Sequence, residues 1–231
     1  MAITAKVYGL ILERFGLEEF KASALKPLVE TSNVNLLLYR MWRAGYLDRV
    51  ARGVFRAVHP VVLALERAGY RWRDKLVQRD YLPMLEFIVA RVVDRFWSDL
   101  VSIVVFGSLA RGKAKPESDI DLLVVSKGLP ENYSDRLTAF REALRGVESM
   151  RLKLWRANGL YPLIDPILLT PEEADVTQPF YLDMVEASVI LFDRGGFMRR
   201  RLDELKAELA KLGAKRIELP DGRWYWELVP A

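Results

Sequence analysis

The sequence predicts an α/β protein in two parts. A helical N-terminal part ends in a β-hairpin, and a larger part alternates strands with amphipathic helices. Residues 1–60 contain three stretches that read as helices, followed by two short runs of β-forming residues. From residue 98 to residue 170, patterns typical of strand, turn, strand, helix and strand follow one another. A chain of 231 residues that is 51% hydrophobic is long enough for two domains and too apolar to be disordered.

The N-terminal part is built from three predicted helices and a hairpin. Pro27 interrupts the second helix, and Ser32 is the expected N-cap of the third. Gly53 lies in the turn between two short runs of strand-forming residues. The predicted helices span residues 3–15, 18–30 and 33–43, and the predicted strands span residues 46–50 and 54–58.

This layout resembles a winged helix-turn-helix DNA-binding domain. The segment GYLDRVARGVFRAV is similar to the end of a recognition helix followed by the wing, and the resemblance covers about a quarter of the chain. It implies that the third helix and the hairpin lie near the phosphates or a groove of double-stranded DNA. A domain used only for protein contact or for dimerisation is the alternative. The residues implied to contact DNA are Arg40, Arg49, Arg52 and Arg56.

The charge of the chain is unevenly distributed. Residues 1–80 contain 14 Lys and Arg and 8 Asp and Glu, whereas residues 81–231 contain 21 and 23. The basic excess therefore lies in the N-terminal third, where a nucleic-acid partner is to be sought. A solvated basic surface without a partner is the alternative explanation of the same excess.

Composition restricts the class of protein further. The absence of cysteine excludes disulfides, thiolate zinc sites and a cysteine nucleophile, and it fits a reducing cytoplasm. No apolar run approaches the ~18 residues of a membrane span, and the N-terminus reads as an amphipathic helix rather than a secretion signal. We therefore expect a cytoplasmic protein with no membrane partner. Only four Asn and two Gln predict a thermophilic source.

The larger part is predicted to comprise a domain at residues 80–195 and a C-terminal extension at 196–231, with residues 60–80 linking it to a first domain at 1–60. Apolar residues at helical spacing after Tyr81 would cover one face of a sheet. The predicted helices span residues 60–73, 81–97, 130–155 and 197–212, and the predicted strands span 101–106, 160–169, 189–192, 216–219 and 223–228.

The segment VFGSLARGKAKPESDIDLLVV, residues 105–125, predicts a phosphate site. Gly107 follows a buried strand, so the backbone can turn sharply there and approach a ligand closely. A helix that starts at Ser108 would aim its free N–H groups at an anion, and the hydroxyl of Ser108 adds a donor. Arg111 could supply a positive charge for the same phosphates.

Asp119 and Asp121 predict a metal site beside this turn. In a strand, residues i and i+2 point to the same face, so the two carboxylates would lie together with Ile120 buried opposite. Ionised carboxylates so close repel each other unless cations lie between them, and hard divalent ions, above all Mg²⁺, suit oxygen ligands. Phosphate and two metal ions in one site are the apparatus of phosphoryl or nucleotidyl transfer.

The motif GSLARG…SDIDLLV resembles the nucleotidyltransferase superfamily, which includes DNA polymerase beta, kanamycin nucleotidyltransferase and the minimal nucleotidyltransferases of prokaryotes. The resemblance covers residues 105–125 directly and about 80–195 as a domain. It implies a mixed sheet with flanking helices, two Mg²⁺ ions, and transfer of a nucleoside monophosphate from an NTP, by default ATP, to an acceptor hydroxyl. Nucleotide contacts are implied for Gly107, Ser108 and Arg111.

The same resemblance implies a third carboxylate on a later strand, which holds metal and activates the acceptor. Asp165 is the candidate because it is the only acid in an apolar, strand-like run. Pro166 departs from the pattern and confines this strand to an edge or a bulge. The acids after Thr170 have an ordinary explanation, because carboxylates stabilise the first turn of a helix.

Three functions stay open at this point, and they can overlap. The first is an active nucleotidyltransferase whose acceptor is a protein, a nucleic acid or a small molecule. The second is a DNA-binding regulator whose second domain binds nucleotide. The third is the antitoxin of a toxin–antitoxin pair, since minimal nucleotidyltransferases often work beside a helical, toxin-like partner protein. A homodimer is compatible with all three.

Overall fold

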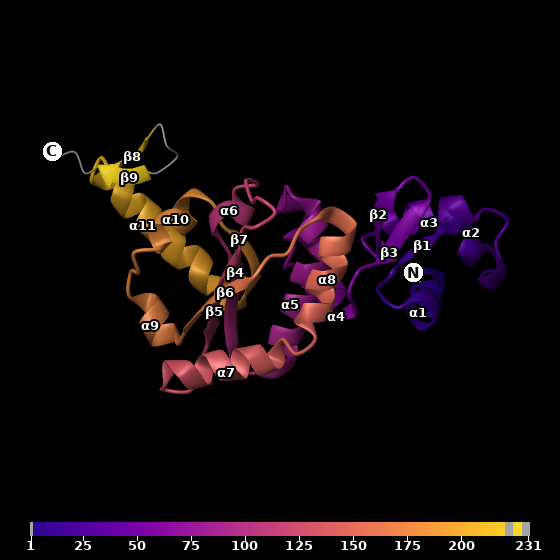
Figure 1. Ribbon diagram of the computed structural model, residues 1–231, viewed down its shortest axis with the longest axis horizontal. Coiled ribbons are helices and arrows are strands. Elements are labelled where there is room, and N and C mark those ends of the chain that lie inside the picture. The colour runs from indigo at the N-terminus through magenta and orange to yellow at the C-terminus, as the bar shows by residue number, and fades with distance from the viewer. Residues whose placement is uncertain (1, 220–223, 228–231) are drawn as a thin grey trace. The chain divides into compact units, whose positions relative to one another are not determined.

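The computed structural model describes residues 2–219 and 224–227, and the chain divides into two compact units, residues 1–69 and 70–231 (Figure 1). No helix in the described part of the chain is long and apolar enough to cross a membrane.

The first unit combines four helices with a small antiparallel sheet. The strand order is β1-β3-β2, and the β2–β3 hairpin that the sequence predicts is confirmed, with Gly53 at φ +73° in its turn. The elements are α1 (Ala2–Phe15), β1 (Glu19–Lys21), α2 (Ala22–Leu25), α3 (Val34–Arg43), β2 (Leu47–Ala51), β3 (Val54–Ala57) and α4 (Pro60–Arg67).

Two local predictions for this unit are wrong. The expected helix at residues 18–30 begins as strand β1, because Phe20 is buried and pairs with Phe55 on β3. The N-cap of α3 is Asn33 instead of Ser32, since Oδ1 of Asn33 accepts a hydrogen bond of 2.9 Å from the Leu36 N–H. The first difference arises from a tertiary contact with β3, and the second arises from a local hydrogen bond of the Asn33 side chain.

The second unit is built on a mixed sheet with the order β6-β5-β4-β7. Strands β5 and β6 run parallel, and β4 pairs antiparallel with β5 and with β7, which confirms the predicted mixed sheet. Pro166 lies on the edge strand β6, where a missing N–H is tolerated. The strands are β4 (Leu100–Val105), β5 (Ile120–Ser126), β6 (Ile164–Leu169) and β7 (Val189–Asp193).

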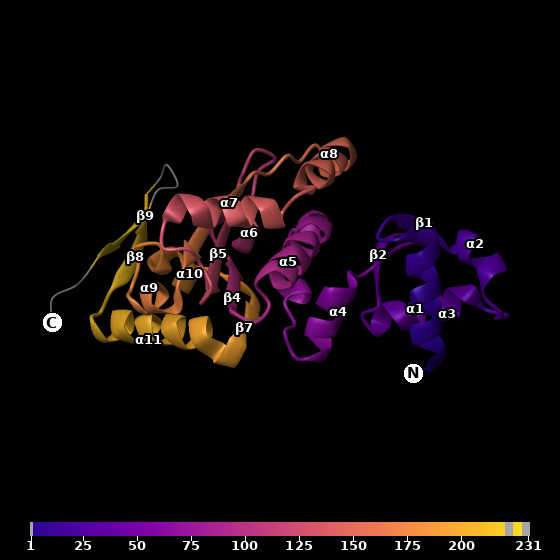
Figure 2. The ribbon, with the colours of Figure 1, turned by 90° about the horizontal axis from the view of Figure 1, so that it is seen from below.

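Helices cover both faces of this sheet, as Figure 2 shows with α11 along one face and α5 and α7 on the other. An apolar cluster joins Leu123 and Val125 of β5 to α10 and α11. The helices of one face are α5 (Leu82–Phe96) and α7 (Tyr133–Ala143), and α8 (Val147–Asn158) packs against α5. The helices of the other face are α9 (Pro171–Asp175), α10 (Tyr181–Glu186) and α11 (Phe197–Lys211).

The predicted long helix at residues 130–155 is wrong in one respect, because it is two helices. Gly146 separates α7 from α8 and adopts φ +99°, a conformation that only glycine takes readily. At the C-terminus, β8 (Lys215–Glu218) pairs antiparallel with β9 (Trp224–Glu227), which confirms a hairpin. Its connecting residues, 220–223, lie outside the described residues.

Candidate active site

The turn after β4 brings Gly107 into direct contact with Asp121. The short helix α6 (Gly107–Ala110) begins at Gly107, which adopts φ +68°. A Cβ atom at this position would lie 1.8 Å from Oδ2 of Asp121, so no larger residue fits without displacing the carboxylate. The Phe106 N–H also donates to the Asp121 carbonyl oxygen at 3.1 Å. The turn that was predicted to bind phosphate therefore adjoins the carboxylate that was predicted to bind metal.

Strand pairing places Asp165 beside Asp121. The two residues are register partners in the parallel β5–β6 pair, so their side chains leave the sheet on the same side. Ile120 is fully buried, while Asp119, directly before β5, is exposed. Asp121 shares its face with Leu123 and Val125, which is the face covered by α10 and α11. The sequence-predicted carboxylates thus gather at one end of two neighbouring strands.

The proximity of these carboxylates is visible in the pKa of Asp121, which is raised to about 6. Partial burial is the largest cause, and the negative charges of Asp165, Asp183 and Asp119 add to it, while Arg111 opposes it. A divalent cation would relieve this repulsion, so the donor set fits a hard metal ion in its chemistry. Within residues 2–219 and 224–227, no three acidic or histidine side chains are already grouped closely enough to hold a metal.

Asp183 also lies at the site, and it is not among the residues predicted from the sequence. Its Oδ1 accepts a hydrogen bond from Nη1 of Arg111 in an ion pair, which places Arg111 at the rim of the acidic site. Figure 1 shows α6 and α10 at the same end of the sheet. Asp183 lies on a short amphipathic helix with no recognisable motif, so only the three-dimensional fold brings it to Arg111.

The loop between α6 and β5 is held by residues 77–81. The side-chain amide of Gln78 makes two hydrogen bonds of 2.8 Å with the backbone of Ala114, one as donor and one as acceptor. Gly112 adopts φ +68° and packs against Val77, whose Cβ would lie 3.0 Å from a Cβ added at Gly112. These contacts fix the path of the chain from the turn at Gly107 to Asp119.

The acids that follow Thr170 have a structural role, as expected. Thr170 and Glu173 form a capping box at the start of α9, with the Thr170 N–H donating to Oε2 of Glu173 at 2.8 Å. Glu173 also pairs with the buried guanidinium of Arg136, and this hydrogen bond lowers the pKa of Glu173. Glu173 is therefore engaged away from the carboxylates at Asp121.

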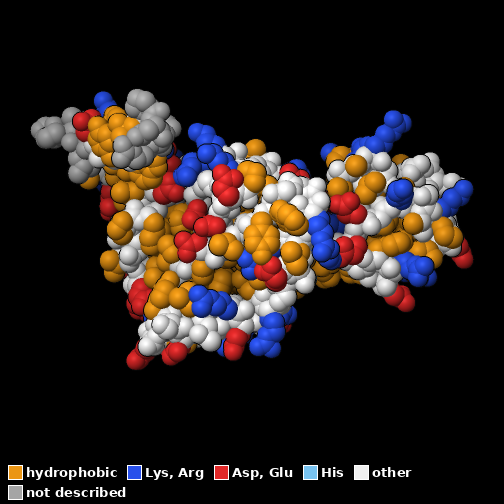
Figure 3. Space-filling view, viewed as in Figure 1, with side chains coloured by type: hydrophobic (Ala, Val, Ile, Leu, Met, Phe, Trp, Pro, Cys, Tyr) orange, Lys and Arg blue, Asp and Glu red, His pale blue; other side chains and the backbone are white. Residues whose placement is uncertain are grey.

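The arginines predicted to contact DNA do not share one environment. Arg40, Arg49 and Arg52 are exposed in the first unit. Arg56 is 5% exposed and pairs with the buried Asp48, so the expectation that it lies on the outer surface of the hairpin is wrong. Figure 3 shows Lys and Arg side chains projecting over the β2–β3 hairpin.

Comparison with known proteins agrees with the class of protein that this fold and these carboxylates indicate, a nucleotidyltransferase. Residues 88–173 match the family model described as the nucleotidyltransferase domain. A protein of Methanocaldococcus jannaschii, provisionally named a protein adenylyltransferase, is 30% identical over 131 residues, which cover 56% of this chain and 83% of the relative. The chain therefore belongs to the nucleotidyltransferase family and is a nucleotidyltransferase enzyme.

Two solved structures are also similar to part of the chain. One is a provisionally named nucleotidyltransferase from Sulfolobus solfataricus, with 28% identity and a TM-score of 0.32 over 50% of this chain and 85% of the other. The second is described as a toxin–antitoxin with AMP-PNP, with 16% identity and a TM-score of 0.33 over 55% of this chain and 90% of the other.

Proposed function

We propose that this nucleotidyltransferase transfers AMP from ATP to a hydroxyl group of a protein and releases pyrophosphate. The observation that carries the proposal is the contact of Asp121 with Gly107 at the point where Asp121 is in register with Asp165. That contact joins an anion-binding turn to a pair of carboxylates. The choice of ATP and of a protein acceptor follows the name of the relative from M. jannaschii.

The triphosphate would bind at the turn. The backbone N–H groups of Gly107 and Ser108 start a helix and have no acceptor within it, so they can donate to the β- and γ-phosphates. The partly exposed hydroxyl of Ser108 adds a donor. Arg111, oriented by Asp183, supplies a positive charge beside them.

Asp119, Asp121 and Asp165 would hold two Mg²⁺ ions. When bound, the ions neutralise the triphosphate and make the acceptor hydroxyl more acidic. This assignment fits the repulsion that raises the pKa of Asp121, because bound cations favour the ionised carboxylate.

The transfer step breaks a phosphoanhydride bond of ATP and forms a phosphoester bond to the acceptor. The acceptor oxygen forms a bond to the α-phosphorus while the bond from that phosphorus to the pyrophosphate oxygen breaks. Asp165 is exposed and lies beside Asp121, so it can orient the acceptor and take the hydroxyl proton. The positive charge of Arg111 would stabilise the negative charge of the leaving pyrophosphate.

Transfer of label from α-³²P-ATP to proteins of a cell lysate tests this function. We expect Mg²⁺-dependent labelling and release of pyrophosphate by the wild-type enzyme, and loss of both in Asp121→Asn and Asp165→Asn. Asp203→Asn is the matched control, because Asp203 is an exposed acid on α11 away from the site. No labelling under any condition, or full labelling by Asp121→Asn, would contradict the proposal.

We propose further that the first unit is a winged helix that binds DNA. The order helix, strand, two helices and a two-stranded hairpin, with α3 directly before the hairpin, supports this interpretation. Replacement of Arg40, Arg49 and Arg52 together by Ala is expected to weaken binding to duplex DNA in a mobility-shift assay. Unchanged binding in that triple variant would show that the surface around these three arginines does not bind DNA.

A further inference from the structure

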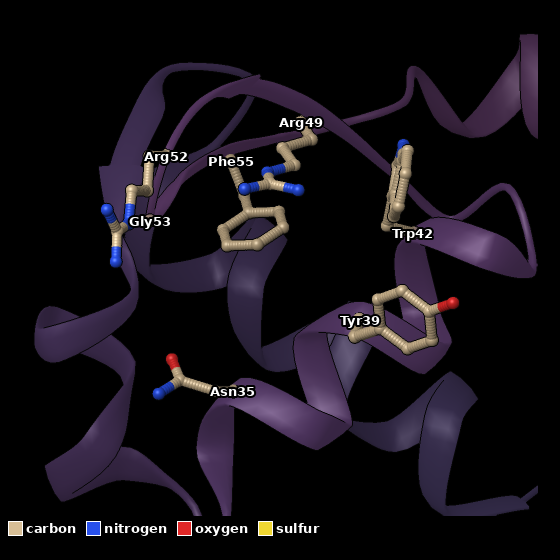
Figure 4. A pocket seen from close by; sticks show the side chains of 7 residues that line it. All are labelled: Asn35, Tyr39, Trp42, Arg49, Arg52, Gly53 and Phe55. Carbon is tan, nitrogen blue, oxygen red and sulfur yellow. The ribbon is translucent and has the colours of Figure 1, made fainter.

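A groove in the first unit has a chemistry that the transferase site does not use. It lies between α3 and the β2–β3 hairpin and has a volume of about 530 Å³, within the range of small-ligand sites. Figure 4 shows side chains from both elements around it. We call it the aromatic groove and define it by Asn35, Tyr39, Trp42, Arg49, Arg52 and Phe55.

Aromatic rings from both elements line the groove. Tyr39 is 51% exposed, and its ring meets that of Trp42 edge to face with centroids 5.8 Å apart. Phe55, on the hairpin, is largely buried and turns its ring toward the groove (Figure 4). The exposed ring of Tyr39 leaves an apolar surface in water, which a planar ligand can cover.

The charged groups of the groove are all positive. The guanidinium carbon of Arg49 lies 5.9 Å from the centroid of the Trp42 ring, and Arg52 stands exposed beside the turn. No acidic residue is among the described residues that line the groove. A ligand that satisfies both the rings and the arginines therefore carries a flat ring and a negative charge, which describes a nucleobase with its phosphate.

Two further observations favour a strand over a free nucleotide. Arg40 and Arg43 are exposed on α3, and the guanidinium carbon of Arg43 lies 5.9 Å from the centroid of the Trp42 ring, so α3 offers further positive charge for neighbouring phosphates. Asn35 at the other end of the helix offers an amide that can pair with the edge of a base. Bases of a duplex are stacked and paired inside the helix, so only an unpaired base can stack on the exposed ring of Tyr39.

We propose that the aromatic groove binds an unpaired base of a single-stranded nucleic acid, with stacking on Tyr39 and Trp42 and with Arg49 and Arg52 on the flanking phosphates. This binding is separate from nucleotidyl transfer. It uses Arg49 and Arg52, which are also proposed to contact duplex DNA, so the two ligands would compete for this surface and the single strand would bind more tightly.

The experiment measures anisotropy of a short fluorescein-labelled oligodeoxynucleotide with the full-length protein. Its arms are the single strand, the duplex of the same sequence, the strand with its bases removed, and AMP as competitor. We expect tightest binding to the single strand, and a loss of about fivefold or more in Tyr39→Ala. Tyr39→Phe, which keeps the ring, is expected to bind as the wild type does.

The comparison of strands separates base stacking from attraction to phosphate. Removal of the bases is expected to weaken binding to the wild type strongly and to weaken binding to Tyr39→Ala less, because only Trp42 then remains for stacking. Equal affinity for duplex and single strand, or no effect of Tyr39→Ala, would overturn the proposal. So would AMP that competes as well as the strand, since the groove would then be a mononucleotide site. Circular dichroism of Tyr39→Ala checks that the variant is folded.

Discussion

Gly107 and Asp121 show how closely the turn after β4 approaches the acidic residues of the site. The carboxylate occupies the volume that any side chain at position 107 would need, and the positive φ of Gly107 disfavours other residues independently. The two effects, steric and conformational, can be separated by experiment because other glycines of the same unit show only one of them.

Gly107→Ala is expected to lower thermal stability and to abolish nucleotidyl transfer, because its Cβ would displace Oδ2 of Asp121. Gly159→Ala is the matched control: Gly159 has φ +70°, but a Cβ there meets no atom within 4 Å. The control is expected to lose about 1 kcal/mol from strain alone and to keep its activity. If Gly107→Ala lost no more melting temperature than Gly159→Ala and kept its transfer activity, the contact between Gly107 and Asp121 would not matter for stability or catalysis.

Asp121→Asn is expected to stabilise the metal-free protein at pH 7.5. The pKa of Asp121 is raised to about 6, so the fold favours its protonated form. That contribution is complete below the ordinary value of 3.8 and is lost as pH rises through about 6. Discounted for partial exposure, we expect a gain of about 1–2 kcal/mol for the variant.

Thermal unfolding in EDTA between pH 4 and pH 7.5 measures this difference. The melting temperatures of wild type and Asp121→Asn should coincide at about pH 4 and diverge as the pH rises. Asp203→Asn, an exposed control, should show no such divergence. A constant difference at all pH values would mean that the charge of Asp121 is not the cause.

At the scale of elements, strand register decides which acids meet. The β5–β6 pair aligns Asp121 with Asp165 through six successive register partners, so the backbone and not the side chains sets their proximity. The capping box at α9 keeps Glu173 in a different role, on Arg136 and the N-terminus of its helix. The element that carries each acid therefore decides its role: Asp165 on β6 lies beside Asp121, and Glu173 on α9 caps its helix.

Glu173→Gln is expected to lower stability without loss of transfer per folded molecule. The change weakens both the capping box and the ion pair with Arg136, and the loss of a cap costs about 1 kcal/mol. Asp165→Asn should show the opposite pattern, with near-normal melting and lost transfer. Lost activity in well-folded Glu173→Gln would assign this acid to the site instead.

The lowered pKa of Glu173 adds a pH dependence to the same variant. The ionised form is favoured in the fold, so its contribution is present above the ordinary pKa and is lost as the pH falls through the lowered value. The stability difference between wild type and Glu173→Gln should therefore shrink in acid. Melting curves at neutral and acidic pH measure it.

Local patterns were enough to predict the turn at Gly107 and the placement of the strand with Pro166 at an edge or a bulge, because buried strands and glycine turns leave such patterns. The mixed sheet was predicted only through the resemblance to the nucleotidyltransferase superfamily. The sequence was not enough to predict β1, whose three residues are too few to show a period and become a strand only by pairing with β3. Asp183 and the burial of Arg56 also escaped prediction. Both depend on ion pairs between residues that are far apart in sequence or indistinguishable by pattern.

At the scale of the whole molecule, the positive net charge lies in the first unit. The chain has 35 Lys and Arg and 31 Asp and Glu; residues 1–69 contain ten of the former and six of the latter, which leaves 25 of each in residues 70–231. Attraction to a polyanion is therefore expected from the first unit alone. A helical protein partner, a homodimer and a thermophilic source stay predictions from the sequence.

Arg52→Ala is expected to reduce the salt dependence of nucleic-acid binding. Each lost phosphate contact lowers the slope of log K against log salt concentration by about 1. Arg145→Ala removes the same charge from an exposed position of the second unit and should leave the slope unchanged. Titrations at several KCl concentrations measure both slopes, and equal effects of the two variants would show that only overall charge matters.

The parallel pairing of β5 and β6 also bears on events at the ribosome. The two strands are joined through α7 and α8, so Asp165 leaves the exit tunnel only after both helices have been made. A nascent chain that has emerged as far as β5 holds the glycine turn and two carboxylates but lacks the third. Catalytic competence is therefore acquired late in translation, after the N-terminal unit has had time to fold by itself.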